Sequence, residues 1–151
     1  MEEKRIITSK ACVALKGCKQ EKRGGSVIIG IGTDIVELER IEKALEGHAF
    51  AARIFCSDEQ AYCEARGRQK TASYAARFAA KEAFVKALGT GFCGGTPADI
   101  EVRRSEGERP EIVLHGAYRE AAEMKKVTFI HLSMSHCRQY AVAQVILEAS
   151  E

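Results

Sequence analysis

One helix-forming segment, RFAAKEAFVKALGTG over residues 77–91, constrains this chain more than any other. At about 100° per residue, Phe78 and Val85 fall on one face of the helix, and Glu82 falls inside the same apolar arc. A carboxylate in a core-facing position costs several kcal/mol unless a cation, a metal ion or hydrogen bonds compensate for it. Glu82 is therefore predicted to be a metal ligand or a member of an ion pair. The simplest alternative is an i to i+4 pair with Lys86.

This central helix is predicted to start at Thr71 and to stop at Gly89, because glycine readily adopts the left-handed conformation that ends many helices. A glycine-rich loop, GTGFCGGTP, follows it. Loops of this composition can wrap a phosphate with backbone N–H groups, but most are simple turns. The loop alone therefore leaves both interpretations open.

A second apolar segment, VIIGIGTDIV over residues 27–36, has the β-branched composition of a buried strand. Gly30 and Gly32 permit the close approach of another backbone or of a ligand, but G-x-G without a third glycine is too weak to indicate a dinucleotide site. Asp34 interrupts the apolar run. Because Glu37 follows three residues later, Asp34 is either the cap of the next helix or a metal ligand, and one carboxylate can serve both roles.

The remaining segments alternate between helical and strand patterns. Further helices are predicted over residues 35–45, 59–66 and 117–126. Strands are predicted in the segments DIEVRR, PEIVLHG, VTFIHLSMSH and QYAVAQVILE. These elements predict an α+β fold, in which an antiparallel sheet packs against helices that include the long central one.

The chain divides into a basic extension and one domain. Residues 1–26 contain seven Lys or Arg and three Glu, whereas residues 27–151 contain 16 basic and 18 acidic residues. We expect residues 1–26 to be a disordered extension and residues 27–151 to form one domain of ordinary size. The excess positive charge belongs to the extension, which argues against a nucleic-acid interface on the domain.

Composition also restricts the environment of the protein. No apolar run approaches the roughly 18 residues that a membrane span needs, so we expect a soluble, cytoplasmic protein with no membrane partner. The six cysteines form no C-x-x-C pair and no cluster with histidine at metal-ligand spacing. We therefore expect free thiols in a reducing compartment.

Five blocks, in this order, resemble the holo-acyl-carrier-protein synthase family of phosphopantetheinyl transferases: GIGTDIVELERI, RIFCSDE, RFAAKEAFVKALGTG, DIEV and SMSH. The resemblance covers about residues 27–148. It implies the 4′-phosphopantetheinyl transferase-like fold, and transfer of 4′-phosphopantetheine from coenzyme A to a serine of apo acyl carrier protein with release of adenosine 3′,5′-bisphosphate. It also implies that Asp34 and Glu82 bind Mg²⁺, which prefers hard oxygen ligands.

The resemblance further implies which residues surround the metal ion. Lys86 joins Asp34 and Glu82 as a catalytic residue, and Lys81 or Lys86 neutralises the diphosphate of coenzyme A. The serine proton passes either to a metal-bound water or to one of the carboxylates, a choice that the sequence leaves open. The residues that the resemblance places around coenzyme A are Arg77, Lys81, Lys86, Gly89, Thr90, Gly91, Ser135 and His136.

Two kinds of partner are also implied. An acidic carrier protein is expected to dock on Arg40, Lys43 and Arg53, with contacts that weaken in salt. Family members are commonly homotrimers with the site between subunits, so a complete pocket is expected to need two chains. The rival interpretations are a non-catalytic oligomeric module that binds coenzyme A, and a different Mg²⁺-dependent nucleotide phosphotransferase.

Overall fold

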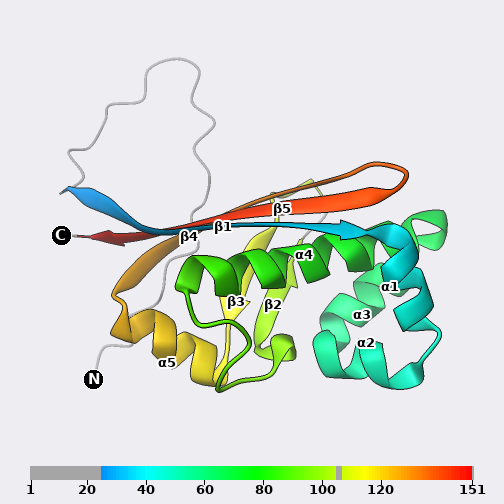
Figure 1. The fold of residues 1–151 in the computed structure, drawn as a ribbon, viewed down its shortest axis with the longest axis horizontal. Helices are drawn as coiled ribbons and strands as arrows, with labels where there is room; N and C mark the ends of the chain where they lie inside the picture. The colour runs from blue at the N-terminus through cyan, green and yellow to red at the C-terminus, as the bar shows by residue number, and fades with distance from the viewer. Residues whose placement is uncertain (1–24, 105–106, 151) are drawn as a thin grey trace, which may run out of the picture.

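The fold consists of a three-stranded antiparallel sheet, a long helix along one face of it, and a further layer of short helices and a two-stranded hairpin (Figure 1). This computed structural model describes residues 25–104 and 107–150. The predicted α+β class is confirmed. In chain order the elements are β1 (Ser26–Glu37), α1 (Leu38–Leu45), α2 (His48–Ile54), α3 (Ser57–Glu64), η1 (Gly67–Gln69), α4 (Lys70–Leu88), η2 (Pro97–Asp99), β2 (Ile100–Arg103), β3 (Glu111–Leu114), α5 (Gly116–Met124), β4 (Val127–His136) and β5 (Tyr140–Ser150).

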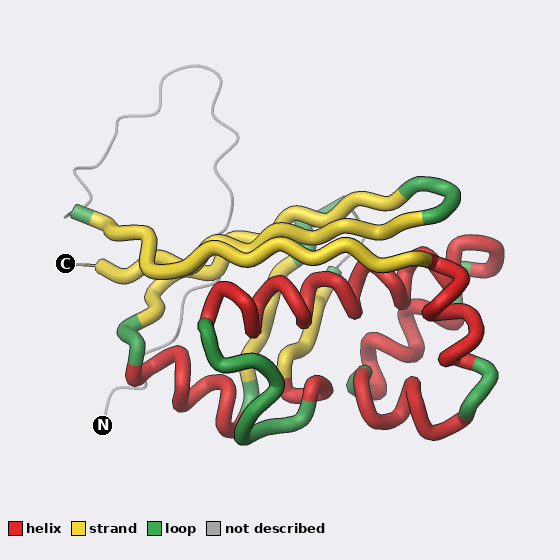
Figure 2. The backbone as a smooth tube through the Cα atoms, viewed as in Figure 1, coloured by secondary structure: helices red, strands yellow, loops and turns green. Residues whose placement is uncertain are grey.

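The larger sheet has the strand order β1-β5-β4, with β5 in the centre. In its register Asp34 lies opposite Ala143, and Ala143 lies opposite Met134. The described helices lie on one side of this sheet (Figure 2). Its other side, called the outer face below, exposes Ile31 and Val142 to solvent.

Helix α4 lies so close to β1 that a side chain at either glycine of the G-x-G segment would collide with it. A Cβ on Gly32 would overlap the carbonyl oxygen of Ala83 and lie 2.7 Å from the amide nitrogen of Ala87, and a Cβ on Gly30 would overlap the carbonyl oxygen of Ala87. Of the two uses predicted for these glycines, the structure therefore shows the close approach of another backbone.

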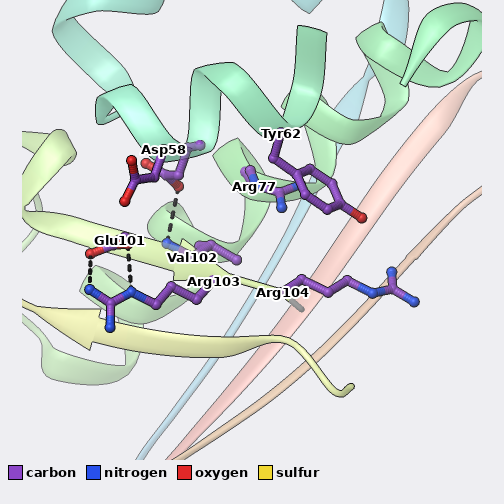
Figure 3. Close-up of a pocket in the computed structure, with 8 residues that line it drawn as sticks. Asp58, Tyr62, Arg77, Glu101, Val102, Arg103 and Arg104 are labelled. Atoms are coloured by element: carbon purple, nitrogen blue, oxygen red, sulfur yellow. Dashed lines mark hydrogen bonds and ion pairs between the residues drawn. The ribbon is translucent and has the colours of Figure 1, made fainter. Parts of the chain in front are cut away.

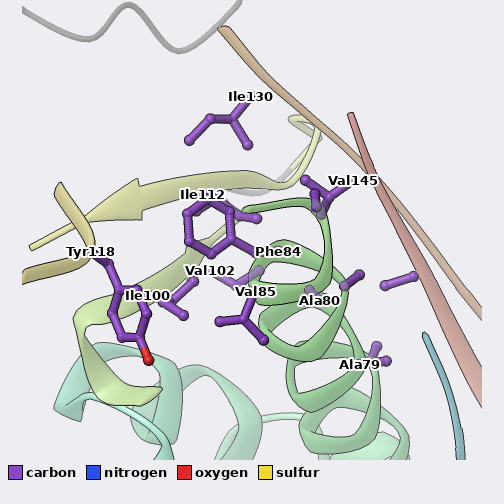
Figure 4. Close-up of a cluster of buried hydrophobic side chains, with 14 of the residues drawn as sticks. Ala79, Ala80, Phe84, Val85, Ile100, Val102, Ile112, Tyr118, Ile130 and Val145 are labelled. Carbon is purple, nitrogen blue, oxygen red and sulfur yellow. The ribbon is translucent and has the colours of Figure 1, made fainter. Parts of the chain in front are cut away.

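The core forms where α4 meets the hairpin of β2 and β3. Phe84 and Val85 of α4 are buried against Ile100 and Ile112 of that hairpin, and Tyr118 of α5 meets Phe84 edge to face with ring centroids 6.3 Å apart (Figure 4). These contacts anchor the middle of α4. None of the described helices is long and apolar enough to span a membrane.

The boundaries of α4 agree with the prediction to within one residue. The helix predicted over residues 35–45 starts later in the structure than was predicted. Gly89 ends α4 with φ 75°, and its N–H donates to the carbonyl of Val85 at 2.9 Å. The helix predicted over residues 35–45 begins only at Leu38, because the preceding β-branched residues remain paired with β5. Asp34 therefore lies within a strand and does not cap a helix.

Two further expectations fall partly outside the described residues. Cys56, Cys63, Cys93 and Cys137 are free thiols, as expected, whereas the cysteines at 12 and 18 lie outside that part of the chain. Of the predicted extension only residues 25 and 26 are described, and Ser26 already belongs to β1. The disorder of residues 1–26 therefore stays a prediction.

Candidate functional site

β1 and α4 bring three of the predicted site residues together. The Nζ of Lys86 lies 2.7 Å from Oδ1 of Asp34 and also donates to the carbonyl of Thr33 at 3.2 Å. The side chain of Asp34 is 14% exposed and that of Lys86 is 50% exposed, so the pair stands at the edge of the core. Lys86 thus forms its hydrogen bonds with β1. Its positive charge also acts to lower the pKa of Glu82, one turn earlier on the helix.

Glu82 lies partly buried beside this pair. Burial, and next the negative charge of Asp34, raise the pKa of Glu82 above its ordinary value, while the positive charges of Lys86 and Arg40 act in the opposite direction. Two carboxylates that repel one another at a partly exposed position suit a divalent cation. The arrangement can therefore accept a metal ion, and a nearby lysine is available for an anion bound to that ion.

The donor set fits Mg²⁺ in particular. Mg²⁺ usually takes one or two carboxylates, with phosphate oxygens and water completing its octahedron. Within residues 25–104 and 107–150 no group of three or more His, Cys, Asp or Glu side chains could hold a metal ion. If Mg²⁺ binds here, Asp34 and Glu82 would be its protein ligands, with phosphate oxygens and water in the other positions.

We expect Glu82 to destabilise the metal-free protein more as the pH rises. Because its pKa is raised in the fold, the folded state binds more protons than the unfolded state between the ordinary value of 4.5 and the raised value. Stability from this group is therefore greatest below 4.5 and is lost as pH rises through the raised pKa. In EDTA, the thermal midpoint of Glu82→Gln should match wild type near pH 4 and exceed it at pH 7. A difference that is constant with pH would contradict this.

Lys81 does not reach the cluster, which corrects the prediction that it binds coenzyme A. Its Nζ is buried and donates to Oε2 of Glu59 at 2.7 Å, to the carbonyl of Ile100 at 2.7 Å and to the carbonyl of Pro97 at 3.0 Å. An ammonium group has three donors, and all three are used inside the protein. Burial lowers the pKa of Lys81, and the charge of Glu59 opposes this. Of the two lysines predicted to neutralise a diphosphate, the structure leaves Lys86.

Arg77 lies on another side of α4. Five residues separate it from Glu82, which corresponds to about 140° around the helix. Its side chain is 3% exposed, its guanidinium carbon lies 4.1 Å from the centroid of the Tyr62 ring, and its buried Nε has no hydrogen-bond partner among the described residues. Arg77 borders a cavity of about 170 Å³ (Figure 3). The cavity is lined by Asp58, Glu59, Tyr62, Arg77, Glu101, Val102, Arg103 and Arg104.

Most residues of this cavity were not predicted from the sequence. Arg103 binds Glu101 through two hydrogen bonds, of 2.6 and 3.0 Å, and Nε2 of His115 lies 2.8 Å from the same carboxylate. Arg103 and His115 hold the pKa of Glu101 below its ordinary value against the effect of burial. The pairing of Glu101 with Arg103 could have been predicted from the segment DIEVRR. Side chains alternate between the two sides of a strand, so these two residues share one side.

The remaining predicted coenzyme A residues lie at two ends of the fold. Gly89 and Gly91 have φ of 75° and 60°, a left-handed conformation that favours glycine, and Thr90 lies between them. Ser135 and His136 end β4 and are exposed. These two groups of residues therefore belong to different parts of the chain: one follows α4, and the other ends β4.

The sheet register separates Ser135 from the carboxylates of the same chain. Ser135 pairs with Val142, which pairs with Ile35 on β1. Side chains alternate along a strand, so Ser135 shares the outer face with these two residues, and Asp34 lies on the helix-covered side. One copy of the chain therefore cannot bring the side chains of Ser135 and Asp34 to the same surface of the sheet.

The three residues predicted to dock the carrier protein are all exposed. Arg40 and Lys43 lie on α1, and Arg53 lies in the last turn of α2. Lys43 forms an ion pair with Glu39 at 2.7 Å, on the same helix. Arg40 is close enough to Glu82 to affect its pKa, so this basic surface adjoins the carboxylate cluster.

The fold is of the α+β class, and the cluster joins two carboxylates and a lysine, a set of side chains that would suit Mg²⁺ and phosphate. Residues 30–145 match the family described as the 4′-phosphopantetheinyl transferase superfamily. The chain belongs to this superfamily. The resemblance seen in its sequence motifs is thereby confirmed, and the matched region contains Asp34, Glu82 and Lys86.

Several relatives resemble the chain over most of their length. It is 46% identical to a holo-(acyl-carrier-protein) synthase of Moorella thermoacetica over 120 residues, covering 79% of this chain and 93% of that protein. It is 48% identical to the enzyme of the same name from Vibrio parahaemolyticus over 125 residues, covering 81% and 98%.

Solved structures agree with these sequence matches. A holo-(acyl-carrier-protein) synthase of Bacillus anthracis in complex with CoA (3′,5′-ADP) superposes with a TM-score of 0.69 at 41% identity, covering 82% of this chain and 98% of that one. The corresponding protein of Neisseria meningitidis has a TM-score of 0.74 at 36% identity, covering 80% and 98%.

Proposed function

We propose that this protein transfers the 4′-phosphopantetheine group of coenzyme A to a serine of an apo acyl carrier protein, with Mg²⁺ as cofactor and adenosine 3′,5′-bisphosphate as the second product. The observation that carries this proposal is the convergence of Asp34, Glu82 and Lys86 where α4 crosses β1. The names of the relatives support the choice of acceptor, and the Bacillus anthracis complex supports the choice of donor. Location in the cytoplasm stays a prediction.

The residues of the cluster would act by charge and position. Asp34 and Glu82 would hold Mg²⁺, which supplies positive charge to a diphosphate when it is bound. Lys86, which projects to the same place, would bind a further phosphate oxygen. The serine oxygen of the carrier attacks the phosphorus that bears the pantetheine arm, and the bond from that phosphorus to the oxygen of the adenosine bisphosphate breaks. The serine proton passes to a carboxylate of the cluster or to water. Such transfers depend mainly on positioning and electrostatic stabilisation.

Mass spectrometry of an apo carrier protein tests this proposal. The carrier is incubated with coenzyme A, Mg²⁺ and this protein, and we expect its mass to increase by one phosphopantetheine arm. Binding of coenzyme A with no change in the carrier's mass would indicate a non-catalytic binding module. Consumption of coenzyme A without any carrier would indicate a different Mg²⁺-dependent enzyme. Either of these two results would contradict the proposal.

We also propose a homotrimer in which neighbouring subunits complete each site. The outer face exposes Ile31, Ile35, Tyr140 and Val142, and Ser135 lies on the same face. A neighbour that covered this face would remove apolar surface from water, which is the main driving force for association. It could also receive Ser135 and His136 of this chain next to its own carboxylates. Arg77 and the loop 89–91 are proposed to contact the remaining parts of coenzyme A.

Val142→Lys should reduce both assembly and transfer. A lysine in the middle of a covered apolar face would have to be buried without a partner, so we expect sedimentation velocity to show a smaller species than wild type. Transfer should fall with it, since each site would then lack its neighbour. The control is Met124→Lys, at an exposed apolar residue of α5 far from this face in sequence. A wild-type protein that is active as a monomer would refute the trimer.

Arg40→Glu should weaken use of the carrier protein. Reversing one charge on a steering surface lowers the association rate, so we expect kcat/KM for the carrier to fall about tenfold at low salt and to lose part of its salt dependence. The KM for coenzyme A should change little. The matched control is Arg119→Glu on α5, another exposed arginine. An equal loss in both variants would exclude a docking role for Arg40.

A further inference from the structure

A buried ion pair lies on another side of α4 from the carboxylate cluster and takes no part in it. Lys81 and Glu59 are 2.7 Å apart, and their side chains are 0% and 1% exposed. The carboxylate of Glu59 also accepts the backbone N–H of Cys56 at 3.0 Å and that of Val102 at 3.1 Å. With the two carbonyls that Lys81 already binds, the pair connects α4 to the start of α3, to η2 and to β2.

The opposite side of α4 packs on β1 through small apolar side chains. There the helix presents the small side chains of Ala79, Ala83 and Ala87, and it faces Gly30 and Gly32 of β1. This close packing fixes the distance between α4 and β1, but methyl groups form no directional bonds that would fix the rotation of the helix about its own axis. Hydrogen bonds are directional, and those of Lys81 with Glu59 and the two carbonyls therefore define the helix position more narrowly.

The position of α4 determines the geometry of the cluster. Glu82 follows Lys81 directly, about 100° further round the helix, and Lys86 lies on the next turn. A shift of α4 that breaks the bonds of Lys81 also moves Glu82 and Lys86 relative to Asp34. We propose that Lys81 and Glu59 are positioning residues, which hold α4 so that Glu82 and Lys86 meet Asp34 on the neighbouring strand. This inference deepens the proposed function and rests on it for the identity of the cation.

A merely structural pair would behave differently from a positioning pair. Buried ion pairs can often be replaced by uncharged residues at little cost in stability, whereas removal of one partner leaves an uncompensated charge. If Lys81 and Glu59 only support the fold, metal binding should recover whenever stability recovers. If they position α4, metal binding should stay weak even after stability has recovered.

The test compares Lys81→Met with the double variant Glu59→Gln/Lys81→Met. The single variant leaves the Glu59 carboxylate buried without its cation, so its thermal midpoint should fall strongly, and the double variant should regain part of the loss. Both lack the bonds to the two carbonyls. We therefore expect Mn²⁺, titrated into each protein and followed by electron paramagnetic resonance, to bind about 10 to 100-fold more weakly in both variants than in wild type. The kcat for transfer should fall in both, with little change in the KM for the carrier.

Val85→Ala provides the matched control. Val85 is buried on the same helix, and its aliphatic side chain has no group that could bond to the cluster or to the ion pair. Its truncation should lower the thermal midpoint through lost packing. Because the bonds of Lys81 remain, its Mn²⁺ affinity and kcat should stay at the wild-type level when measured well below that midpoint.

Two results would overturn the inference. One is a double variant whose Mn²⁺ affinity recovers together with its thermal midpoint. The other is a crystal structure of the double variant in which Nζ of Lys86 still lies 2.7 Å from Oδ1 of Asp34, as it does here. If wild type itself failed to bind Mn²⁺ or to modify the carrier, the proposed function would be wrong. The distance from Nζ of Lys86 to Oδ1 of Asp34 in the double variant would still decide whether Lys81 and Glu59 position α4.

Discussion

Glu82→Gln is expected to lower the rate of phosphopantetheine transfer by about 10²–10³-fold or more, because it removes an anionic ligand of the Mg²⁺ whose positive charge would stabilise the transferring phosphate. The amide keeps the size of the side chain but cannot serve as an anionic ligand for Mg²⁺. The same change removes the repulsion with Asp34, which contributes to the raised pKa of Glu82. Loss of activity should therefore accompany a gain in the stability of the metal-free protein, a combination that damage to the fold cannot produce.

The measurements for Glu82→Gln are the initial rate of carrier modification over a range of Mg²⁺ concentrations, and the thermal midpoint in EDTA at pH 7. Asp34→Asn provides a comparison, since it removes the other carboxylate. It also loses the ion pair with Lys86, so it should lose activity without the same gain in stability. Unchanged turnover and unchanged Mg²⁺ dependence in Glu82→Gln would refute the assignment of the metal site.

Gly32→Val is expected to destabilise the native structure severely. A Cβ at this position would overlap the carbonyl oxygen of Ala83, which belongs to the backbone of α4 and cannot move alone. Either β1 or the whole helix would have to shift, and we expect a loss of about 4 kcal/mol or more in the free energy of unfolding. Circular dichroism during urea unfolding measures this loss.

Gly47→Ala is the matched control for the glycine variant. Its Cβ would lie 3.6 Å from the carbonyl oxygen of Ala44, an ordinary contact, and its φ of −88° is open to alanine. We expect a change of less than about 1 kcal/mol in this variant. The milder variant Gly32→Ala is expected to fold with lower stability and to lose transfer activity, because displacement of β1 from α4 also displaces Asp34. A stable Gly32→Val with full activity would show that α4 and β1 are not in close contact.

Lys81 illustrates where inference from the sequence stopped. Its place beside Glu82 in the K-E-A segment suggested a role at the phosphate, but consecutive residues of a helix point about 100° apart. The partners of Lys81 are Glu59, 22 residues earlier, and two backbone carbonyls, 16 and 19 residues later. No local pattern specifies which distant group fills a buried space, so this pair could be found only from the folded chain.

Local sequence patterns predicted the extent of α4 and the close approach of a backbone or a ligand at Gly30 and Gly32. They also singled out the carboxylates Asp34 and Glu82, whose role as metal ligands stays a proposal. Each of these depends on local periodicity, on glycine stereochemistry or on a motif that a family shares. The tertiary structure alone decided that Lys86 rather than Lys81 meets Asp34, because that choice depends on how α4 is rotated against β1. Helix rotation is set by contacts between segments far apart in the chain, and these contacts have no signature in either segment alone.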